Sequence, residues 1–254
     1  MIVQLIHQGS MMIAFQGLAK QYGSFEAVKP LSLQVNKGEV FGFLGPNGAG
    51  KTTTIRMLMG ILVPSAGKVL IDGLDCHRDG AAVKRKVGYL PDNPIFYDYL
   101  RGREILQFVA EMHGYPRAEA VARAARLLTE FGLDEASEDF AVNYSLGMKK
   151  KLGLACALIH DPAVLILDEP INGLDPRASR DVQERLLRIA AAGTTIFVST
   201  HLLDMAQKLC SRVAIIHRGA LAATGSLDDI RQQLSSDGSL EDIFLQLTDE
   251  TVAA

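Results

Sequence analysis

The sequence has few cysteines, no long hydrophobic run and no excess of positive charge. Its three cysteines, Cys76, Cys156 and Cys210, include no C-x-x-C pair and are typical of buried thiols in a reducing compartment. The longest apolar run, 152–167, is interrupted by polar residues at 160–161, so no segment reaches the roughly 18 residues of a membrane-spanning helix. The formal net charge of −3 excludes a general basic surface and argues against a nucleic-acid partner.

Residues 1–12 lack the basic segment and the small-residue cleavage site of a secretory signal peptide. We expect them to be an extension outside the folded domain. The composition, 48% apolar and 22% charged, is that of an ordinary globular protein. The main domain is expected over residues 13–225, followed by a C-terminal helical appendage at 226–254.

Most of the chain alternates short apolar runs with segments of helical periodicity, which predicts an α/β fold with a mainly parallel sheet. The runs at 39–45, 163–168 and 194–201 are mostly apolar, as in strands buried on both faces. Residues 13–40 instead predict short strands joined by turns, which we interpret as an N-terminal antiparallel β subdomain. Three successive helical segments at about 98–160 interrupt the alternation and predict an inserted helical subdomain.

A glycine-rich segment, GPNGAGKT at 45–52, matches the pattern G-x-x-x-x-G-K-[ST] between a predicted strand and a predicted helix. The backbone N–H groups of such a loop and the helix N-terminus bind nucleotide phosphates, which predicts a P-loop NTPase core. Lys51 is expected to reach the β- and γ-phosphates, and the Thr52 hydroxyl to bind Mg²⁺. The alternative, a glycine-rich turn without a ligand, is disfavoured by the strand-loop-helix context. The predicted nucleotide-binding residues of the loop are Gly45, Pro46, Asn47, Gly48, Ala49, Gly50, Lys51, Thr52 and Thr53.

Polar side chains follow two other predicted strands, at the edge where an open α/β sheet binds its ligands. Asp168 is expected to hold Mg²⁺, and Glu169 to polarise the water that attacks the γ-phosphate. Two adjacent carboxylates after an apolar strand are costly to bury unless a cation compensates one of them. The alternative is a pair of exposed loop acids. His201 is expected to donate a hydrogen bond to the γ-phosphate and to orient the water, although a histidine after an apolar run is often simply packed.

These motifs, together with YSLGM at 144–148, NGLDP at 172–176 and STH at 199–201, resemble the ATP-binding-cassette ATPases, the nucleotide-binding subunits of transporters. The P-loop alone occurs in many families, but this ordered combination is specific to one and covers residues 13–226. The resemblance implies a transport-coupled ATPase that uses ATP and Mg²⁺. It also implies two partners: a second ATP-binding subunit, expected to be a copy of this chain, and a separate multi-span membrane subunit. The expected location is peripheral, on the cytoplasmic face of the cell membrane.

Two features of the sequence bear on the partner. The aromatic stretch IFYDYL at 95–100 either forms part of a groove for a helix of the membrane subunit or packs within the helical insertion. The other function that the fold permits is a soluble ATP-driven clamp or assembly factor. Clamp-type relatives that act on nucleic acid usually carry two cassettes or long coiled-coil insertions, and this sequence has one cassette and neither insertion. Transport is therefore favoured.

The segment YSLGMKKK at 144–151 places three lysines at the start of a predicted helix, where the partial positive charge disfavours cations. The resemblance implies that Ser145 and the Gly147 backbone cap the ATP held by a second chain, so that its γ-phosphate is the anion opposite these lysines. The alternative is a solvated basic helix start. Leu146 and Met148 stand where the family usually has glycine and glutamine, and such forms resemble the export-type subgroup.

Three further residues carry over from the resemblance. Tyr22 matches the aromatic residue that stacks on adenine, while the alternative is a core aromatic beside Phe15 and Phe25. Asp175 resembles the acid that joins the two nucleotide sites across the dimer. Asp92 stands where glutamine is usual, and we expect it to ligate Mg²⁺ through its shorter, charged side chain.

Overall fold

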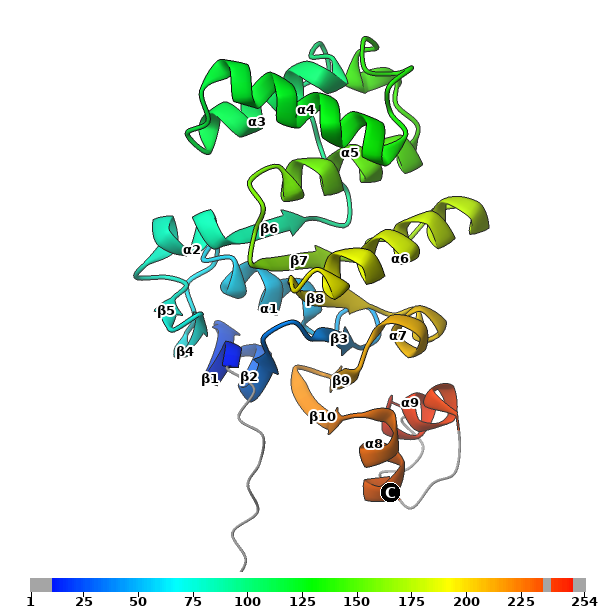
Figure 1. Ribbon diagram of the computed structural model, residues 1–254. Helices are drawn as coiled ribbons and strands as arrows, with labels where there is room; N and C mark the ends of the chain where they lie inside the picture. Colours follow the sequence, from blue (N-terminus) through cyan, green and yellow to red (C-terminus); the bar gives the residue numbers. More distant parts are fainter. Residues whose placement is uncertain (1–10, 235–238, 249–254) are drawn as a thin grey trace, which may run out of the picture.

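A six-stranded sheet forms the centre of the protein in this computed structural model, which describes residues 11–234 and 239–248 (Figure 1). In spatial order the strands are β10-β9-β3-β8-β7-β6, and each neighbouring pair from β9 to β6 is parallel. Strand β10 runs antiparallel to β9. The prediction of a mainly parallel sheet is therefore confirmed. The strands are β3 (Val40–Leu44), β6 (Val87–Leu90), β7 (Val164–Asp168), β8 (Thr195–Thr200), β9 (Arg212–His217) and β10 (Ala220–Gly225).

Strands β3, β7 and β8 are buried along their whole length because both faces of the sheet are covered. On one face, Val164 and Ile166 of β7 pack in a core with α1, α2 and the N-terminal strands. On the other, Leu165 and Leu167 pack with α6, α7 and the helical insertion. The covering helices are α1 (Lys51–Leu58), α2 (Gly80–Lys86), α6 (Pro176–Ala191) and α7 (Leu203–Leu209).

The N-terminal strands form a separate antiparallel sheet of order β2-β1-β4-β5. Where short strands were expected, β1 and β2 each have 12 residues, and shifts in their register allow such long strands to bend. Met11 and Met12, expected to lie in the extension, are the first residues of β1, and residues 1–10 lie outside the described chain. The strands are β1 (Met11–Tyr22), β2 (Phe25–Asn36), β4 (Ala66–Ile71) and β5 (Leu74–Asp75).

The helical insertion lies together at one end of the molecule, beyond β6 (Figure 1). Its apolar side chains join the same core as the outer face of β7 and β8, so the insertion is packed on the sheet. Gly132 ends α4, the longest helix of the insertion, in the left-handed conformation, with φ of 62°, as is usual for a glycine C-cap. The elements are α3 (Gly102–Met112), α4 (Arg117–Phe131), the 3₁₀ turn η1 (Ala141–Asn143) and α5 (Leu146–Leu158).

The described part of the C-terminal segment forms two helices, α8 (Leu227–Leu234) and α9 (Leu240–Thr248). Ile230, Leu240 and Ile243 are buried in a small core with Leu44 and Val213 of the sheet, so the appendage packs on the main domain. The predicted break at 235–238 lies outside the described residues. Within the described chain, none of the helices combines the length and hydropathy needed to cross a membrane.

Candidate nucleotide-binding and catalytic site

The glycine-rich loop runs from β3 into α1 and passes very close to two other backbone segments. A Cβ atom at Gly45 would lie 2.4 Å from the backbone oxygen of Ile216, and one at Gly50 would lie 2.7 Å from that of Ala27. Gly50 also has φ of 107°, which side chains disfavour, directly before the first residue of α1. Glycine is therefore required at both positions, and the loop leads into the positive end of a helix, as a phosphate site needs.

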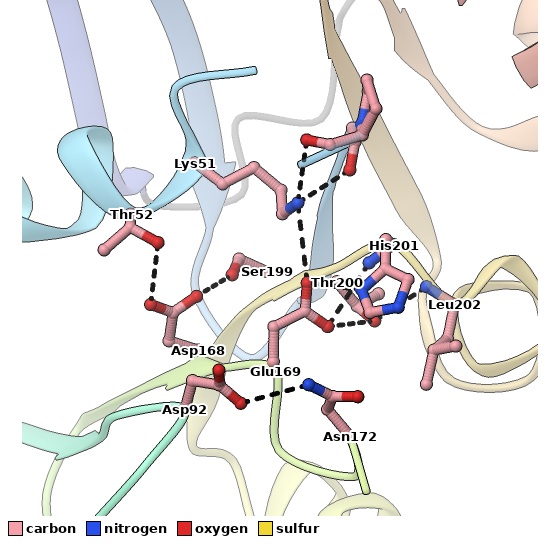
Figure 2. A network of polar contacts seen from close by, with 12 residues as sticks. Lys51, Thr52, Asp92, Asp168, Glu169, Asn172, Ser199, Thr200, His201 and Leu202 are labelled. Atoms are coloured by element: carbon pink, nitrogen blue, oxygen red, sulfur yellow. Dashed lines mark hydrogen bonds and ion pairs between the residues drawn. The ribbon is translucent and has the colours of Figure 1, made fainter. Parts of the chain in front are cut away.

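Lys51 lies at the centre of the site and is buried, with 7% of its surface exposed. Its Nζ donates to the backbone oxygens of Gly45 at 2.7 Å and Pro46 at 3.2 Å (Figure 2). The same nitrogen lies 3.5 Å from Oε1 of Glu169. A buried ammonium group is stable only with such acceptors around it. Lys51 thus joins the loop to the acidic end of β7.

Asp168 is the last residue of β7, and its two carboxylate oxygens have different partners. Oδ2 accepts a hydrogen bond from the Thr52 hydroxyl at 3.3 Å, and Oδ1 accepts one from Ser199, its neighbour on β8. Burial raises the pKa of Asp168, and the negative charge of Glu169 adds to this effect. A divalent cation would relieve that cost, and carboxylate and hydroxyl oxygens are ligands that Mg²⁺ prefers. Thr52 and Asp168 therefore fit the predicted metal.

Glu169 follows β7 in a left-handed backbone conformation, with φ of 47°, that residues other than glycine seldom adopt. Its Oε2 accepts hydrogen bonds from the Thr200 hydroxyl at 3.0 Å and from the His201 backbone N–H at 3.4 Å. Its Oε1 lies 2.9 Å from Nδ1 of His201. Because a carboxylate only accepts, Nδ1 carries the proton in this contact. A strained backbone beneath a fully bonded carboxylate is typical of a functional site.

A single cavity of 440 Å³ brings the loop, both acids and His201 together. Gly45 and Ala49 belong to the loop but are not among its lining residues. If His201 also donates to a phosphate as predicted, its second ring nitrogen must be protonated too. The predicted residues that line the cavity are Pro46, Asn47, Gly48, Gly50, Lys51, Thr52, Thr53, Asp92, Asp168, Glu169 and His201.

The cavity wall also contains Phe25, Ala27 and Asn172, which were not among the predicted site residues. Tyr22, predicted to stack on adenine, is not among the lining residues and lies opposite Phe25 where β1 meets β2. Its ring is half exposed, with Nζ of Lys20 5.1 Å from the ring centre. The adenine contact of Tyr22 stays a prediction. The one sequence signal for Phe25 is its place after the turn, opposite that tyrosine.

Asp92 lies at the rim of the cavity, with its side chain half exposed. Its Oδ1 accepts a hydrogen bond from the Asn172 amide at 3.5 Å (Figure 2). The same oxygen accepts one from Nζ of Lys150 at 3.4 Å. These partners come from α5 and from the segment after β7, so Asp92 connects the helical insertion to the acidic strand end. Its predicted role as a metal ligand stays a prediction.

The residues predicted to act across a dimer cap the starts of two helices. Oγ of Ser145 accepts from the Met148 backbone N–H at 3.2 Å and caps α5. Asp175 caps α6 by accepting hydrogen bonds from the N–H groups of Ala178 at 3.0 Å and Arg177 at 2.9 Å. The hydrogen bond from Ala178, and to a smaller extent that from Arg177, lowers the pKa of Asp175. Ser145, Gly147 and Asp175 are not among the residues that line the cavity of their own chain. Their roles across a dimer stay predictions.

Two of the three lysines that begin α5 have acceptors in their own chain. Lys150 is 2% exposed, and its Nζ donates to the backbone oxygen of Glu169 at 2.5 Å as well as to Asp92. Lys151 lies 2.9 Å from Asp181 of α6. We expected the lysines either to face the phosphate of a second chain or to form a solvated basic surface. Both expectations are wrong for Lys150, because it is buried and its partners, the Asp92 carboxylate and the Glu169 carbonyl oxygen, belong to the same chain.

A glycine-rich loop at a helix start, facing two acids at the end of a nearby strand, defines a P-loop nucleotide-binding protein. The model of the ABC transporter family matches residues 28–172, so the chain belongs to the ATP-binding-cassette (ABC) transporter family.

Relatives of this chain include ATP-binding proteins of ABC transporters. An uncharacterized one from Nostoc sp. is 43% identical over 209 residues, which are 80% of this chain and 61% of the relative. The daunorubicin resistance ATP-binding protein DrrA3 of Streptomyces coeruleorubidus is 37% identical over 89% of this chain and 71% of its own length. A solved ATP-binding subunit of an ABC transporter is 34% identical, with a TM-score of 0.86 over 93% of this chain and 99% of that one. The chain thus spans less than two thirds of the Nostoc relative.

Proposed function

We propose that this chain binds and hydrolyses ATP, that two copies close on two ATP molecules, and that closure drives a separate membrane subunit of an exporter. The observation that carries the proposal is the one cavity that contains Lys51, Thr52, Asp168, Glu169 and His201. A phosphate-binding loop, ligands for a divalent cation and a carboxylate beside a histidine are the parts that phosphoryl transfer to water requires.

Each of these groups has a distinct task in hydrolysis. Lys51, whose Nζ lies 3.5 Å from Glu169, is placed to neutralise charge on the β- and γ-phosphates. Thr52 and Asp168 would hold Mg²⁺, which supplies positive charge to the phosphate oxygens. Glu169 accepts the proton of the attacking water, and His201 orients the Glu169 carboxylate through its Nδ1–H. The protein thereby performs the reaction by positioning and charge.

The start of α5 supports closure around ATP by two copies. Ser145 and Leu146 are exposed there, and no acidic residue in the first turn of α5 opposes an anion. The positive end of α5 suits a phosphate that a second molecule brings. Ser145 and the Gly147 backbone would then cap the ATP in the partner's loop, and Asp175 would join the two sites. Since only the closed pair completes both sites, ATP binding favours closure.

An exposed aromatic surface supports a separate membrane subunit as the second partner. Tyr97 packs edge-on against Phe108, and Tyr99 against Phe140, yet all four remain substantially exposed. Phe96 and Leu100 of the stretch 95–100 pack against the core, whereas Tyr97 and Tyr99 stay exposed. Exposed apolar surface of this kind marks a contact site. Such a contact would hold the protein peripherally on the cytoplasmic face of the membrane. The name of the DrrA3 relative, a daunorubicin resistance protein, favours export.

Two measurements test this proposal. Purified protein should release phosphate from ATP in the presence of Mg²⁺. EDTA should stop the reaction because it removes the positive charge that Mg²⁺, held by Thr52 and Asp168, would supply to the phosphates. The protein should co-purify from detergent-solubilised membranes with a multi-span protein, and Tyr97→Ser with Tyr99→Ser should weaken this association without reducing basal ATP hydrolysis. No hydrolysis would contradict the enzymatic part. A water-soluble scaffold partner in place of a membrane protein would indicate a clamp or assembly factor.

A further inference from the structure

Lys150 is a buried cation that the steps of hydrolysis described above do not use. It is 2% exposed, lies on α5 of the helical insertion, and contacts the backbone of Glu169, directly after β7. Burial lowers the pKa of Lys150, which means that the charged amine is costly at this place, while the negative charge of Asp92 offsets part of that cost. A structural lysine on a surface helix would not need to be buried. Its position therefore calls for a specific partner.

The main partner of Lys150 is the backbone of Glu169, the residue that we expect to activate water. Nζ of Lys150 donates to the Glu169 carbonyl oxygen at 2.5 Å. The same oxygen accepts a weaker hydrogen bond from the Asn172 backbone N–H at 3.3 Å, so the carbonyl is held from two sides. This peptide group follows a residue with φ of 47°, a conformation that costs on the order of 1 kcal/mol or more and persists only when its surroundings hold it.

The second partner, Asp92, makes this arrangement specific to the present sequence. Asp92 stands where glutamine is usual in the family, and its Oδ1 lies 3.4 Å from Nζ of Lys150. An ammonium between a carboxylate and a carbonyl is held more firmly than one bonded to a carbonyl alone, because the carboxylate contact is charge-assisted. Lys150 therefore links three segments: the start of α5, the loop after β6 that carries Asp92, and the end of β7 that carries Glu169.

We propose that Lys150 is a positioning residue for ATP hydrolysis, which fixes the Glu169 backbone, and thereby the Glu169 carboxylate, relative to α5. This inference rests on the proposed hydrolysis and assigns a further residue to it. Lys150 lies five positions after Ser145, little more than one turn of helix. A displacement of the start of α5 is thus passed to the backbone of the general base through one side chain.

The variant Lys150→Met tests the proposal, because methionine keeps an unbranched side chain but donates no hydrogen bond. We expect kcat to fall roughly 10- to 100-fold, since small displacements of a catalytic group cost about this much. KM and the affinity for a non-hydrolysable ATP analogue should stay within about threefold, because Lys150 does not line the cavity. Lys150→Arg restores a charged donor and should recover a large part of kcat. Lys151→Met is the matched control and should behave as wild type, since its ion pair with Asp181 is partly exposed.

A second measurement separates positioning from a general loss of structure. In single-turnover experiments, Lys150→Met should lower the hydrolysis rate in the wild-type background. In the Glu169→Gln background the same substitution should lower the rate less than about twofold, because both changes act on the same group. Full multiplication of the two losses would overturn the proposal, as would a kcat of Lys150→Met within about twofold of wild type. If Lys150→Met does not fold, Lys150→Gln replaces it, and a loss in KM without one in kcat overturns the proposal. Wild-type turnover reports separately on hydrolysis itself, and its absence would overturn both proposals.

Discussion

The nucleotide cavity and the start of α5 differ in how far a single chain completes them. In the cavity, Lys51, Asp168 and Glu169 each contact a second functional group of the same chain. At the start of α5, Ser145 is exposed and caps its own helix, and Leu146 beside it is 42% exposed. The side chains of the first region are thus held in place by contacts within one chain, without a ligand. The second has the chemistry of a phosphate contact, but its residues Ser145 and Gly147 do not line the nucleotide cavity of their own chain, which is why we assign it to a second copy.

The two regions are nevertheless connected, and the connection accounts for one of the lysines in YSLGMKKK, Lys150. Lys150 runs from α5 to the Glu169 carbonyl, so the exposed region and the cavity share one buried hydrogen bond. A contact of Ser145 with a second molecule therefore has a direct mechanical route to the general base. Variants that disable one region at a time test this difference, starting with the cavity.

The largest effect is expected from Lys51→Ala, which removes the fixed cation of the cavity. ATP affinity should fall markedly and hydrolysis should become undetectable, because the phosphates lose a charge-assisted donor and Glu169 loses its nearest cation. Binding of a fluorescent ATP analogue and phosphate release measure both effects. Lys86→Ala, which removes an exposed ion pair with Asp72, is the control and should match wild type. Near-normal affinity and turnover in Lys51→Ala would remove Lys51 from the site.

Glu169→Gln should separate binding from hydrolysis within the same cavity. The amide keeps the size of the side chain but cannot take a proton, a role that contributes about 10²–10⁴ in rate. ATP should still bind, and the variant should accumulate as an ATP-bound dimer that elutes earlier in size-exclusion chromatography than the nucleotide-free protein. Normal turnover in this variant would place the base elsewhere.

Residues at the strand ends could be predicted because the physics that places them is simple. Continuous apolar runs predicted β7 and β8, and parallel strands in one sheet end at a common edge, so Asp168, Glu169 and His201 had to meet the loop at 45–52. The strands β4 and β5 and the helix α2 were missed, since these elements are short and their residues are partly exposed. Strand β4 is defined by its pairing with β1, and β5 by its pairing with β4, rather than by local sequence.

The contacts of Lys150 show what sequence reasoning could not reach. Its partners Asp92 and Glu169 lie 58 and 19 residues away along the chain, on elements that meet only when the insertion packs on the sheet. No periodicity distinguishes Lys150 from Lys149 and Lys151, yet one is buried and the other two are not. The run of lysines at a helix start correctly indicated that an anionic partner was needed. Its location had to come from tertiary structure.

A mixture of two inactive variants tests whether the two regions act across a dimer, because each variant is defective in a different region. Ser145→Arg keeps its own cavity but cannot cap a neighbour's ATP, and Lys51→Ala has the opposite defect. Each homodimer should be nearly inactive. In a mixed dimer one site combines an intact cavity with an intact cap, so activity should return to at most about half of wild type if the sites act independently. Single-turnover assays must accompany steady-state assays, since coupling between sites can suppress turnover. No recovery, with mixed dimers shown to form, would contradict action across the dimer.

The smallest effect concerns the far end of α5, where His160 holds the helix to the sheet. Its Nε2 lies 3.2 Å from the backbone oxygen of Val87, an acceptor, so Nε2 carries the proton. Its Nδ1 is buried without a hydrogen-bond partner among the described residues, and its ring stacks on His113 at 3.8 Å. Burial, followed by the charge of His113, lowers the pKa of His160 to about 4. Between pH 6.5 and pH 4, His160 is therefore protonated in the unfolded chain but remains neutral in the native protein.

The sign of the pH effect follows from this difference in proton binding. Above pH 6.5 both states hold a neutral imidazole and His160 contributes no pH dependence. As the pH falls from 6.5 toward 4, the unfolded state binds more protons than the native state, so stability decreases. Because the side chain is only partly buried, we expect a loss of about 1 kcal/mol at pH 5, or roughly 2–4 °C in melting temperature. His160→Gln keeps a donor for Val87 but does not titrate. The fall in melting temperature between pH 7.5 and pH 5 should therefore be smaller in this variant than in wild type by about that amount. The exposed His77→Asn serves as the control and should change little. An unchanged pH dependence in His160→Gln would show that the pKa of His160 is not lowered in the native protein and would contradict this prediction.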